Sequence, residues 1–178
     1  NEAVALLAEK PGRARALAGG TDLLVQMKVG RRQVDRVVDI KGIDELSEIH
    51  VNADGSVTIG AAVPAHKVYS HPAVGAGYAG VIDSASIVGG IAIQGRASLG
   101  GNLCNAAPSG DTIPSLAAAG AVAVIAGRVY MGMGNSFSFS SVGDATAWEN
   151  QDVSAGKVNF VINCPKQDQV NGFASFQG

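Results

Sequence analysis

Cysteine and histidine are scarce in this sequence, and each scarcity excludes a class of site. The 178 residues include two cysteines and three histidines. Two cysteines cannot build the disulfide framework of a small secreted domain, and they cannot supply the four thiolates of an iron–sulfur cluster. The histidines are not grouped with cysteines or with repeated carboxylates, so the sequence predicts no metal site. This cysteine usage agrees with a cytoplasmic protein.

The sequence also lacks a strong charge and a long apolar run. The net charge is −2 and the pI is about 5.9, and the basic residues of the N-terminal part are scattered rather than clustered. We therefore expect no nucleic-acid partner. The longest apolar stretch, residues 116–126, is interrupted by Gly120 and is too short to cross a bilayer. No membrane span is expected, and no signal peptide is visible in these residues.

No arrangement of a nucleophile with a general base is visible. No serine or cysteine is matched with a histidine and a carboxylate in a recognisable pattern, and no pair of carboxylates is tied to a histidine. The sequence therefore predicts no catalytic side chain. This absence is typical of proteins whose chemistry belongs to a bound cofactor.

Glycine, by contrast, is abundant, with 24 residues, and two Gly-Gly turns stand out. Gly19-Gly20 follows a strand-like run and precedes an apolar helix, and Gly100-Gly101 lies in a Gly- and Asn-rich stretch over residues 96–114. Glycine lets backbone N–H groups approach a ligand closely, and such a turn before a helix favours phosphate. Either turn alone could be a tight corner. Two of them indicate both sides of one site for a phosphate-bearing cofactor.

Polar side chains beside the turns are candidates for binding or for local structure. Thr21 could hold a pyrophosphate or only cap a helix, whereas Asp22 fits a helix-start charge better. Asn105 could bind the cofactor or hold its own loop. Asp111 is expected to be the N-cap of the next helix, with Pro114 in the first turn of that helix.

Two more side chains of the second stretch have open roles. Arg96 could pair with a phosphate or lie on the surface. Cys104 is expected to be a small buried apolar residue rather than a redox group. His66 is expected on the surface of a helix.

Hydrophobic periodicity and turn residues predict an α+β protein with two small halves. Asp54-Gly55 predicts a two-residue hairpin turn, and residues 91–99 read as an extended approach to the second turn. The expected helices cover residues 2–9, 23–28, 63–69, 78–89 and 112–119. The expected strands cover residues 15–18, 36–40, 51–54, 56–60 and 121–125.

The two turns resemble the two flavin loops of a known family. Residues 17–24, LAGGTDLL, resemble the first loop of the FAD-binding subunit of molybdenum hydroxylases, and residues 93–106, IQGRASLGGNLCNA, resemble the second. That family includes the medium subunit of carbon monoxide dehydrogenase and the flavin domain of xanthine dehydrogenase. The resemblance implies FAD as cofactor. It implies cofactor contacts from Ala18, Gly19, Gly20, Thr21, Asp22, Leu23, Leu99, Gly100, Gly101, Asn102, Asn105 and Asp111.

The resemblance implies a two-subdomain FAD-binding fold of the vanillyl-alcohol oxidase/p-cresol methylhydroxylase type, with FAD in the cleft between the halves. It covers residues 1–127, the expected FAD-binding domain, and it does not extend to residues 128–178. Seven of the nine aromatic residues fall in this tail. Residues 136–140, 157–163 and 172–176 read as strands, so an atypical Ser-rich β tail of uncertain origin is expected.

The implied function is electron transfer within a heteromeric oxidoreductase. The FAD subunit would take electrons from [2Fe-2S] clusters of a small subunit, fed by a molybdopterin-binding large subunit, and pass them to an external acceptor. The alternative is a non-catalytic relic of the fold whose β tail serves assembly or adhesion. A third option is a flavoprotein with the same fold and another reaction, like cell-wall precursor reductases or vanillyl-alcohol oxidase relatives.

Overall fold

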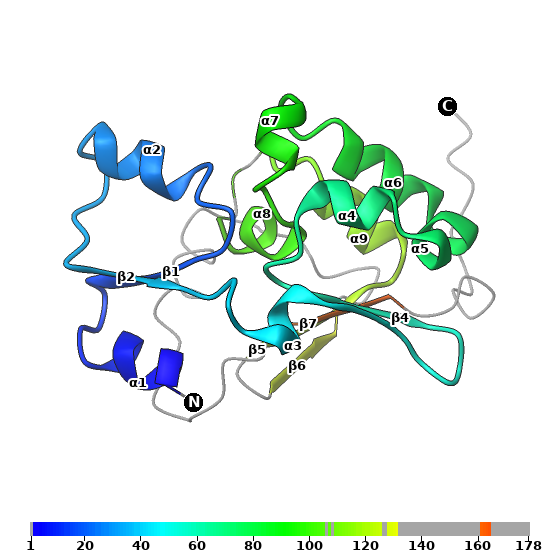
Figure 1. Ribbon diagram of the computed structural model, residues 1–178, viewed down its shortest axis with the longest axis horizontal. Coiled ribbons are helices and arrows are strands. Elements are labelled where there is room, and N and C mark those ends of the chain that lie inside the picture. The colour runs from blue at the N-terminus through cyan, green and yellow to red at the C-terminus, as the bar shows by residue number, and fades with distance from the viewer. Residues whose placement is uncertain (1, 106, 108, 126–127, 132–160, 165–178) are drawn as a thin grey trace.

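The structure, a computed structural model, describes residues 2–105, 107, 109–125, 128–131 and 161–164. Its described strands form two separate sheets (Figure 1), one with two strands and one with five. Helices and strands alternate over residues 2–51, and a run of helices over residues 65–118 then separates the strands at 57–60 and 122–125, so the predicted mixture of both is confirmed. No helix in the described part of the chain is long and apolar enough to cross a membrane.

The small sheet pairs two parallel strands, β1 (Ala14–Leu17) and β2 (Arg36–Asp39), in the register Ala14↔Arg36 to Leu17↔Asp39. Parallel strands need a crossover connection, and helix α2 (Leu23–Lys28) lies in it. Helix α1 (Glu2–Ala8) lies on the other side of this sheet from α2 (Figure 1). The strands match the β-branched run predicted at 36–40 and the short run before Gly19-Gly20.

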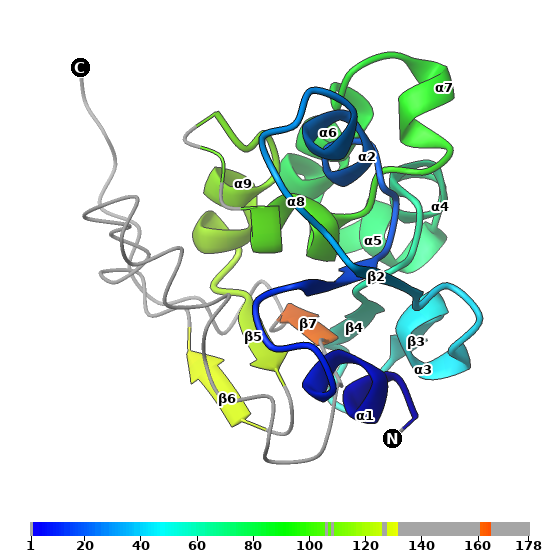
Figure 2. The same ribbon diagram turned by 90° about the vertical axis from the view of Figure 1, so that its left-hand side faces the viewer.

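The large sheet is antiparallel throughout, in the order β3-β4-β7-β5-β6. Its strands are β3 (Ile49–Val51), β4 (Val57–Gly60), β5 (Val122–Ile125), β6 (Arg128–Met131) and β7 (Val161–Cys164). Helices cover one face of it in both views (Figures 1 and 2). The remaining helices are α3 (Asp44–Ser47), α4 (Ala65–Tyr69), α5 (Pro72–Gly77), α6 (Ala79–Ser86), α7 (Ile91–Gln94), α8 (Leu99–Asn105) and α9 (Ile113–Ala118).

Buried apolar residues form two clusters that follow the two sheets. The larger cluster joins β4 and β5 to helices α4, α6, α8 and α9, with Val68, Ala85 and Leu99 fully buried. The smaller cluster joins α1 and β2 to Leu46 and Ala62. Burial of apolar surface in each cluster is the main stabilising contribution. The turn after β1 therefore lies between two packed units.

The hairpin between β3 and β4 differs from the prediction in its loop length. The backbone N–H of Asn52 donates to the carbonyl of Ser56, so three residues rather than two connect the strands. Gly55 has φ of 82°, and its N–H donates to the carbonyl of Asn52. This is the three-residue hairpin with a left-handed glycine. Asp54 accepts a hydrogen bond from the Ser56 N–H, which fixes the loop.

Two predictions around the second turn are wrong. Residues 91–99 are not extended but contain α7, and Gly100-Gly101 does not lie in a loop but in the first turn of α8. The alternating Ile91 and Ile93 are 85% and 41% exposed, so the alternation does not mark a buried strand face. The side chain that anchors α7 is instead the buried Gln94, which donates to the Ser86 carbonyl and accepts from Tyr69 Oη.

The tail beyond residue 127 contributes two described strands to the large sheet. The strand predicted at 157–163 is confirmed in part by β7, and residues 157–160 lie outside the described residues. The strands predicted at 136–140 and 172–176 also lie outside the described residues. The boundary between residues 127 and 128 stays a prediction.

Candidate functional site

The first Gly-Gly turn, residues 18–22, is held by its carbonyl groups. The carbonyl of Leu17 accepts the Ile40 N–H, and that of Ala18 accepts Lys41 Nζ at 3.0 Å. The carbonyl of Gly19 accepts Arg96 Nε at 3.1 Å. Gly20 has φ of 77°, and its carbonyl accepts the Leu24 N–H, which starts α2. Four successive carbonyls are thus fixed by donors from both parts of the molecule.

The N–H groups of the same turn have no such partners. Among the described residues, none accepts a hydrogen bond from the backbone N–H of Gly19, Gly20, Thr21 or Asp22. Buried or half-buried N–H groups normally find an acceptor in the protein, in water or in a ligand. This turn therefore offers N–H donors, whereas the carbonyls of residues 17–20 are already hydrogen-bonded.

The second turn is the N-terminal part of α8, capped by Ser98. Ser98 Oγ accepts the Gly101 N–H at 3.1 Å, and the Ser98 carbonyl accepts the Asn102 N–H. Gly100 packs against Ala61, and a Cβ added there would lie 2.5 Å from the Ala61 Cβ. Glycine at this position lets α8 approach the chain after β4. A Cβ on Gly19 would lie 2.3 Å from the Arg96 carbonyl oxygen, so the two turns are in direct contact.

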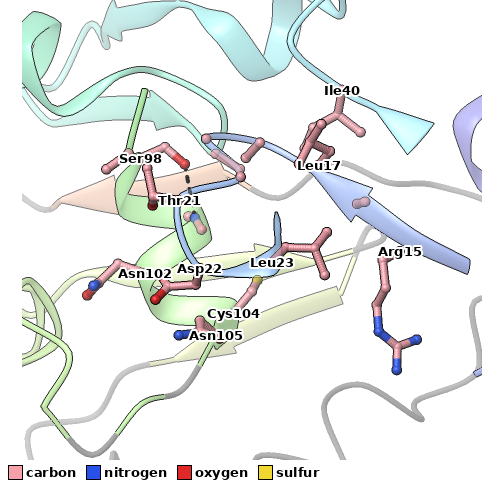
Figure 3. A pocket seen from close by; sticks show the side chains of 18 of the residues that line it. Arg15, Leu17, Thr21, Asp22, Leu23, Ile40, Ser98, Asn102, Cys104 and Asn105 are labelled. Atoms are coloured by element: carbon pink, nitrogen blue, oxygen red, sulfur yellow. Dashed lines mark hydrogen bonds between the residues drawn. The ribbon is translucent and has the colours of Figure 1, made fainter. Parts of the chain in front are cut away.

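The two turns enclose a cavity of about 300 Å³ (Figure 3). Most of the predicted site residues line it: Ala18, Gly19, Gly20, Thr21, Asp22, Leu23, Gly100, Gly101, Asn102 and Asn105. Leu99 and Asp111 do not. Leu99 is fully buried in the larger apolar cluster, and Asp111 is exposed. The prediction that both turns face one space is confirmed, whereas the role of these residues as cofactor ligands stays a prediction.

Asp111 is not the cap of the helix that follows it. Helix α9 begins at Ile113, with Thr112 at the cap position, and Pro114 lies in the first turn as predicted. Thr112 is 1% exposed, and both its N–H and its hydroxyl donate to Asn102 Oδ1, at 3.2 and 2.8 Å. The buried Thr112 hydroxyl finds its acceptor on α8, so it ties the start of α9 to α8 and makes no capping bond to α9 itself.

The second asparagine of α8 bridges the cavity. Gln26 Nε2, on α2, donates to Asn105 Oδ1 at 3.0 Å, and both residues line the cavity. Asn105 therefore links α8 to α2, a contact that differs from the expected hold on its own loop, and its role as a cofactor ligand stays a prediction. Cys104 is exposed and lines the cavity, so the expectation of a buried cysteine is wrong. His66 is exposed on α4, as predicted.

Several lining residues were missed from the sequence. Arg15 and Arg32 lie on a strand and after a helix, yet both reach the cavity. Gln26 also lines it, as do Leu17, Ile40, Ala61, Val88 and Ser98. The single local signal for any of them was Ser98, a cap residue before a glycine-rich helix. Arg96 is not among the residues that line the cavity, and its Nε donates to the Gly19 carbonyl of the first turn; whether it also pairs with a phosphate stays a prediction.

The only described carboxyl near the first turn with a shifted pKa is Asp39. The Lys41 ammonium hydrogen-bonds Asp39 Oδ1 at 2.9 Å and, together with the Lys41 backbone N–H, lowers the pKa of Asp39. Lys41 also donates to the Ala18 carbonyl. An ionised Asp39 therefore supports the lysine that fixes the turn.

The fold has two sheets, and its two Gly-Gly segments line one cavity. This arrangement is that of a protein that binds a small molecule. Residues 1–132 match the family described as the FAD binding domain in molybdopterin dehydrogenase. The chain belongs to this family, and FAD is its cofactor. The family and the cofactor predicted from the two loops are both confirmed.

Individual relatives agree with this assignment. The xanthine dehydrogenase FAD-binding subunit of Escherichia coli O157:H7 is 35% identical over 111 residues, which cover 62% of this chain and 38% of that protein. The carbon monoxide dehydrogenase medium chain of Hydrogenophaga pseudoflava is 33% identical over 110 residues, covering 62% and 38%. This chain thus spans less than half the length of these relatives, which are named as dehydrogenase subunits.

Solved structures share the fold. Carbon monoxide dehydrogenase from Hydrogenophaga pseudoflava matches with a TM-score of 0.76 and 27% identity, over 98% of this chain and 56% of that chain. Quinoline 2-oxidoreductase from Pseudomonas putida 86 matches with a TM-score of 0.77 and 26% identity, over 93% and 55%. The expected mixed fold of the flavin subunit is therefore confirmed.

Proposed function

We propose that this chain is the FAD-binding part of an electron-transfer subunit in a molybdopterin-dependent hydroxylase or dehydrogenase. Electrons would arrive from iron–sulfur clusters of a small subunit, next to a molybdopterin-binding large subunit, and leave to an external acceptor. The two cysteines in these 178 residues are too few to hold such a cluster, and we propose that the clusters lie on a partner subunit. The finer fold proposed is the two-subdomain flavin fold of the vanillyl-alcohol oxidase type.

The observation that carries this proposal is the cavity between the two turns. The N–H groups of residues 19–22 have no acceptor among the described residues, and Arg15 and Arg32 also line the cavity. Donors and cations in this number fit the acceptor-only oxygens of a pyrophosphate. FAD supplies the redox chemistry when bound. The chain's own residues bind it, orient it and exclude water.

The alternative, a relic of the fold with a separate β tail, is disfavoured by the position of β7. That strand lies between β4 and β5 and pairs with both, in the registers Ile59↔Ile162 and Ala123↔Ile162. Part of the tail thus completes the sheet that carries the larger apolar cluster. A tail used for assembly alone has no need to fill the centre of this sheet.

The test is the flavin content of the purified chain. We expect absorption bands of an oxidised flavin and, after denaturation, about one equivalent of released FAD. A colourless chain is then titrated with FAD and followed by quenching of flavin fluorescence. A chain that neither carries FAD nor takes it up contradicts the proposed function.

A further inference from the structure

The two asparagines of α8 present the same chemical face to the cavity. Asn102 and Asn105 are three positions apart, so their side chains share one face of the helix, and both line the cavity (Figure 3). Each uses its side-chain oxygen for a donor of the protein. Asn102 Oδ1 accepts two hydrogen bonds from Thr112, and Asn105 Oδ1 accepts one from Gln26.

Asn102 Oδ1 accepts two hydrogen bonds and Asn105 Oδ1 accepts one, so in each amide the –NH2 group is the part that has no partner among the described residues. The –NH2 group of asparagine donates and cannot accept, and rotating the amide by 180° would exchange the two roles. No described residue accepts a hydrogen bond from Nδ2 of either asparagine. Both amides therefore add donors to the cavity wall that the N–H groups of the first turn already supply.

The orientation of Asn105 depends on a residue far away in sequence. Gln26 lies 79 positions earlier, on α2, and its carbonyl accepts the N–H groups of Arg31 and Arg32. These bonds end α2 and place the Gln26 side chain against α8. Because Gln26 donates its Nε2 to Asn105 Oδ1, turning the Asn105 amide alone would lose this bond.

We propose that Gln26 is a positioning residue of the flavin site, which fixes the Asn105 amide so that it donates to an acceptor oxygen of the cofactor. This proposal rests on the proposed function. It adds that α8 favours ligand groups that accept hydrogen bonds. Gln26 on α2 controls this preference through its hydrogen bond to Asn105.

The test compares the Kd for FAD of Gln26→Glu and Gln26→Met with that of the wild type, by flavin fluorescence titration. Glutamate only accepts, so Asn105 must turn its nitrogen to it and its oxygen to the ligand. We expect a rise in Kd of about tenfold or more, roughly the loss of one hydrogen bond. Methionine leaves the amide free to rotate, and a smaller rise is expected.

The carboxylate of Gln26→Glu could also weaken binding by repelling the phosphates of FAD. A double-mutant cycle with Asn105→Ala distinguishes this repulsion from an effect through Asn105. If Gln26 acts through Asn105, then Gln26→Glu changes the Kd far less in the Asn105→Ala background. An equal change in both backgrounds overturns the proposal. Urea unfolding of the apoprotein is the second readout, because a merely structural role would lower stability without this coupling.

The outcomes separate the two proposals. A wild-type chain that binds FAD, together with Gln26 variants that bind it equally well, overturns the positioning role alone. A wild-type chain that does not bind FAD overturns the proposed function and the positioning role with it. Tight binding by the wild type, weak binding by Gln26→Glu and a strong coupling to Asn105 support both.

Discussion

Gly100 is a residue at which a single methyl group decides the packing. An added Cβ would lie within 2.6 Å of the Ala61 Cβ, Cα and carbonyl oxygen, and backbone cannot move aside cheaply. We expect Gly100→Ala to destabilise the protein by about 1–3 kcal/mol, as other overpacked core sites do. Urea unfolding followed by circular dichroism measures the change.

Gly80 is the matched control for Gly100. It is also the second residue of its helix, α6, and a Cβ there would meet nothing within 4 Å. Gly80→Ala should leave the stability unchanged or raise it by up to about 1 kcal/mol, because alanine favours helix. Equal losses in the two variants would show that helix α8 does not depend on close approach to Ala61.

Cys104 is a residue that can report on occupancy of the cavity. Its thiol is exposed and lines the cavity, so a bound cofactor should cover it. In a Cys164→Ser background we expect alkylation by iodoacetamide to slow about tenfold when FAD is present at ten times its Kd, since about one tenth of the sites stay empty. Mass spectrometry of the Cys104 peptide follows the reaction.

The urea-unfolded chain is the control for this experiment, since its alkylation rate must not depend on FAD. Equal rates in the folded chain with and without saturating FAD would place the cofactor away from Cys104.

At the scale of elements, the sequence predicts the helices and strands that depend on a pattern of neighbouring residues. Helices α1, α2 and α9 and strands β2 and β5 follow from apolar spacing and β-branched runs. Helix α8 does not, because two glycines and two asparagines in seven residues disfavour a helix. What makes it a helix is the Ser98 cap and the packing of Gly100 on Ala61, and the latter is visible only in three dimensions.

Some features of the candidate site can likewise be predicted from the sequence, and others depend on how the elements pack. Both Gly-Gly pairs stand out in the sequence, because glycine pairs beside polar residues are a local feature, although the second pair lies in a helix and not in the predicted loop. The bond from Gln26 to Asn105 joins residues distant in sequence, and Arg15 and Arg32 line the same cavity from different parts of the chain. No spacing rule predicts them, since they depend on how β1, α2 and α8 pack.

Strand β2 and the turn after β1 are linked by Asp39 and Lys41, and this link depends on pH. Lys41 lowers the pKa of Asp39, so the stabilisation is complete above the ordinary pKa of a carboxyl group and is lost as the pH falls through the lowered value. In Lys41→Met we expect the pKa of Asp39 to rise part of the way back, because the backbone N–H of residue 41 still donates. NMR titration of the Asp39 carboxyl carbon measures it.

Lys28→Met is the control, because Lys28 is exposed and lies at the end of α2, away from Asp39. It removes the same charge and should leave the pKa of Asp39 almost unchanged. A shift of the same size in both variants would assign the effect to net charge rather than to the hydrogen bond.

At the scale of the whole molecule, the large sheet depends on a strand far along the chain. The large sheet joins β4 to β5 only through β7, since the described order is β3-β4-β7-β5-β6. Strand β7 lies between β4 and β5 and pairs with both of them. The wall of the cavity built on α8 rests on the apolar cluster over this sheet.

A proline in β7 tests this dependence. Every residue of a central strand bonds to one neighbour or the other, so Ile162→Pro removes a ladder hydrogen bond wherever its N–H points. We expect a loss of at least about 2 kcal/mol, because the partner carbonyl is left without a donor. Amide hydrogen exchange should then speed up in both β4 and β5.

Val51→Pro, in the edge strand β3, is the matched control. Hydrogen bonds join Glu48 to Gly60 and Asn52 to Ser56, so by alternation the N–H of Val51 points away from β4. Its loss should change stability by no more than about 0.5 kcal/mol. If Ile162→Pro were tolerated as well as Val51→Pro, the sheet would not need β7. A chain cut after β5 and β6 would then be expected to keep its FAD site, and the tail would return to the separate role that the position of β7 argues against.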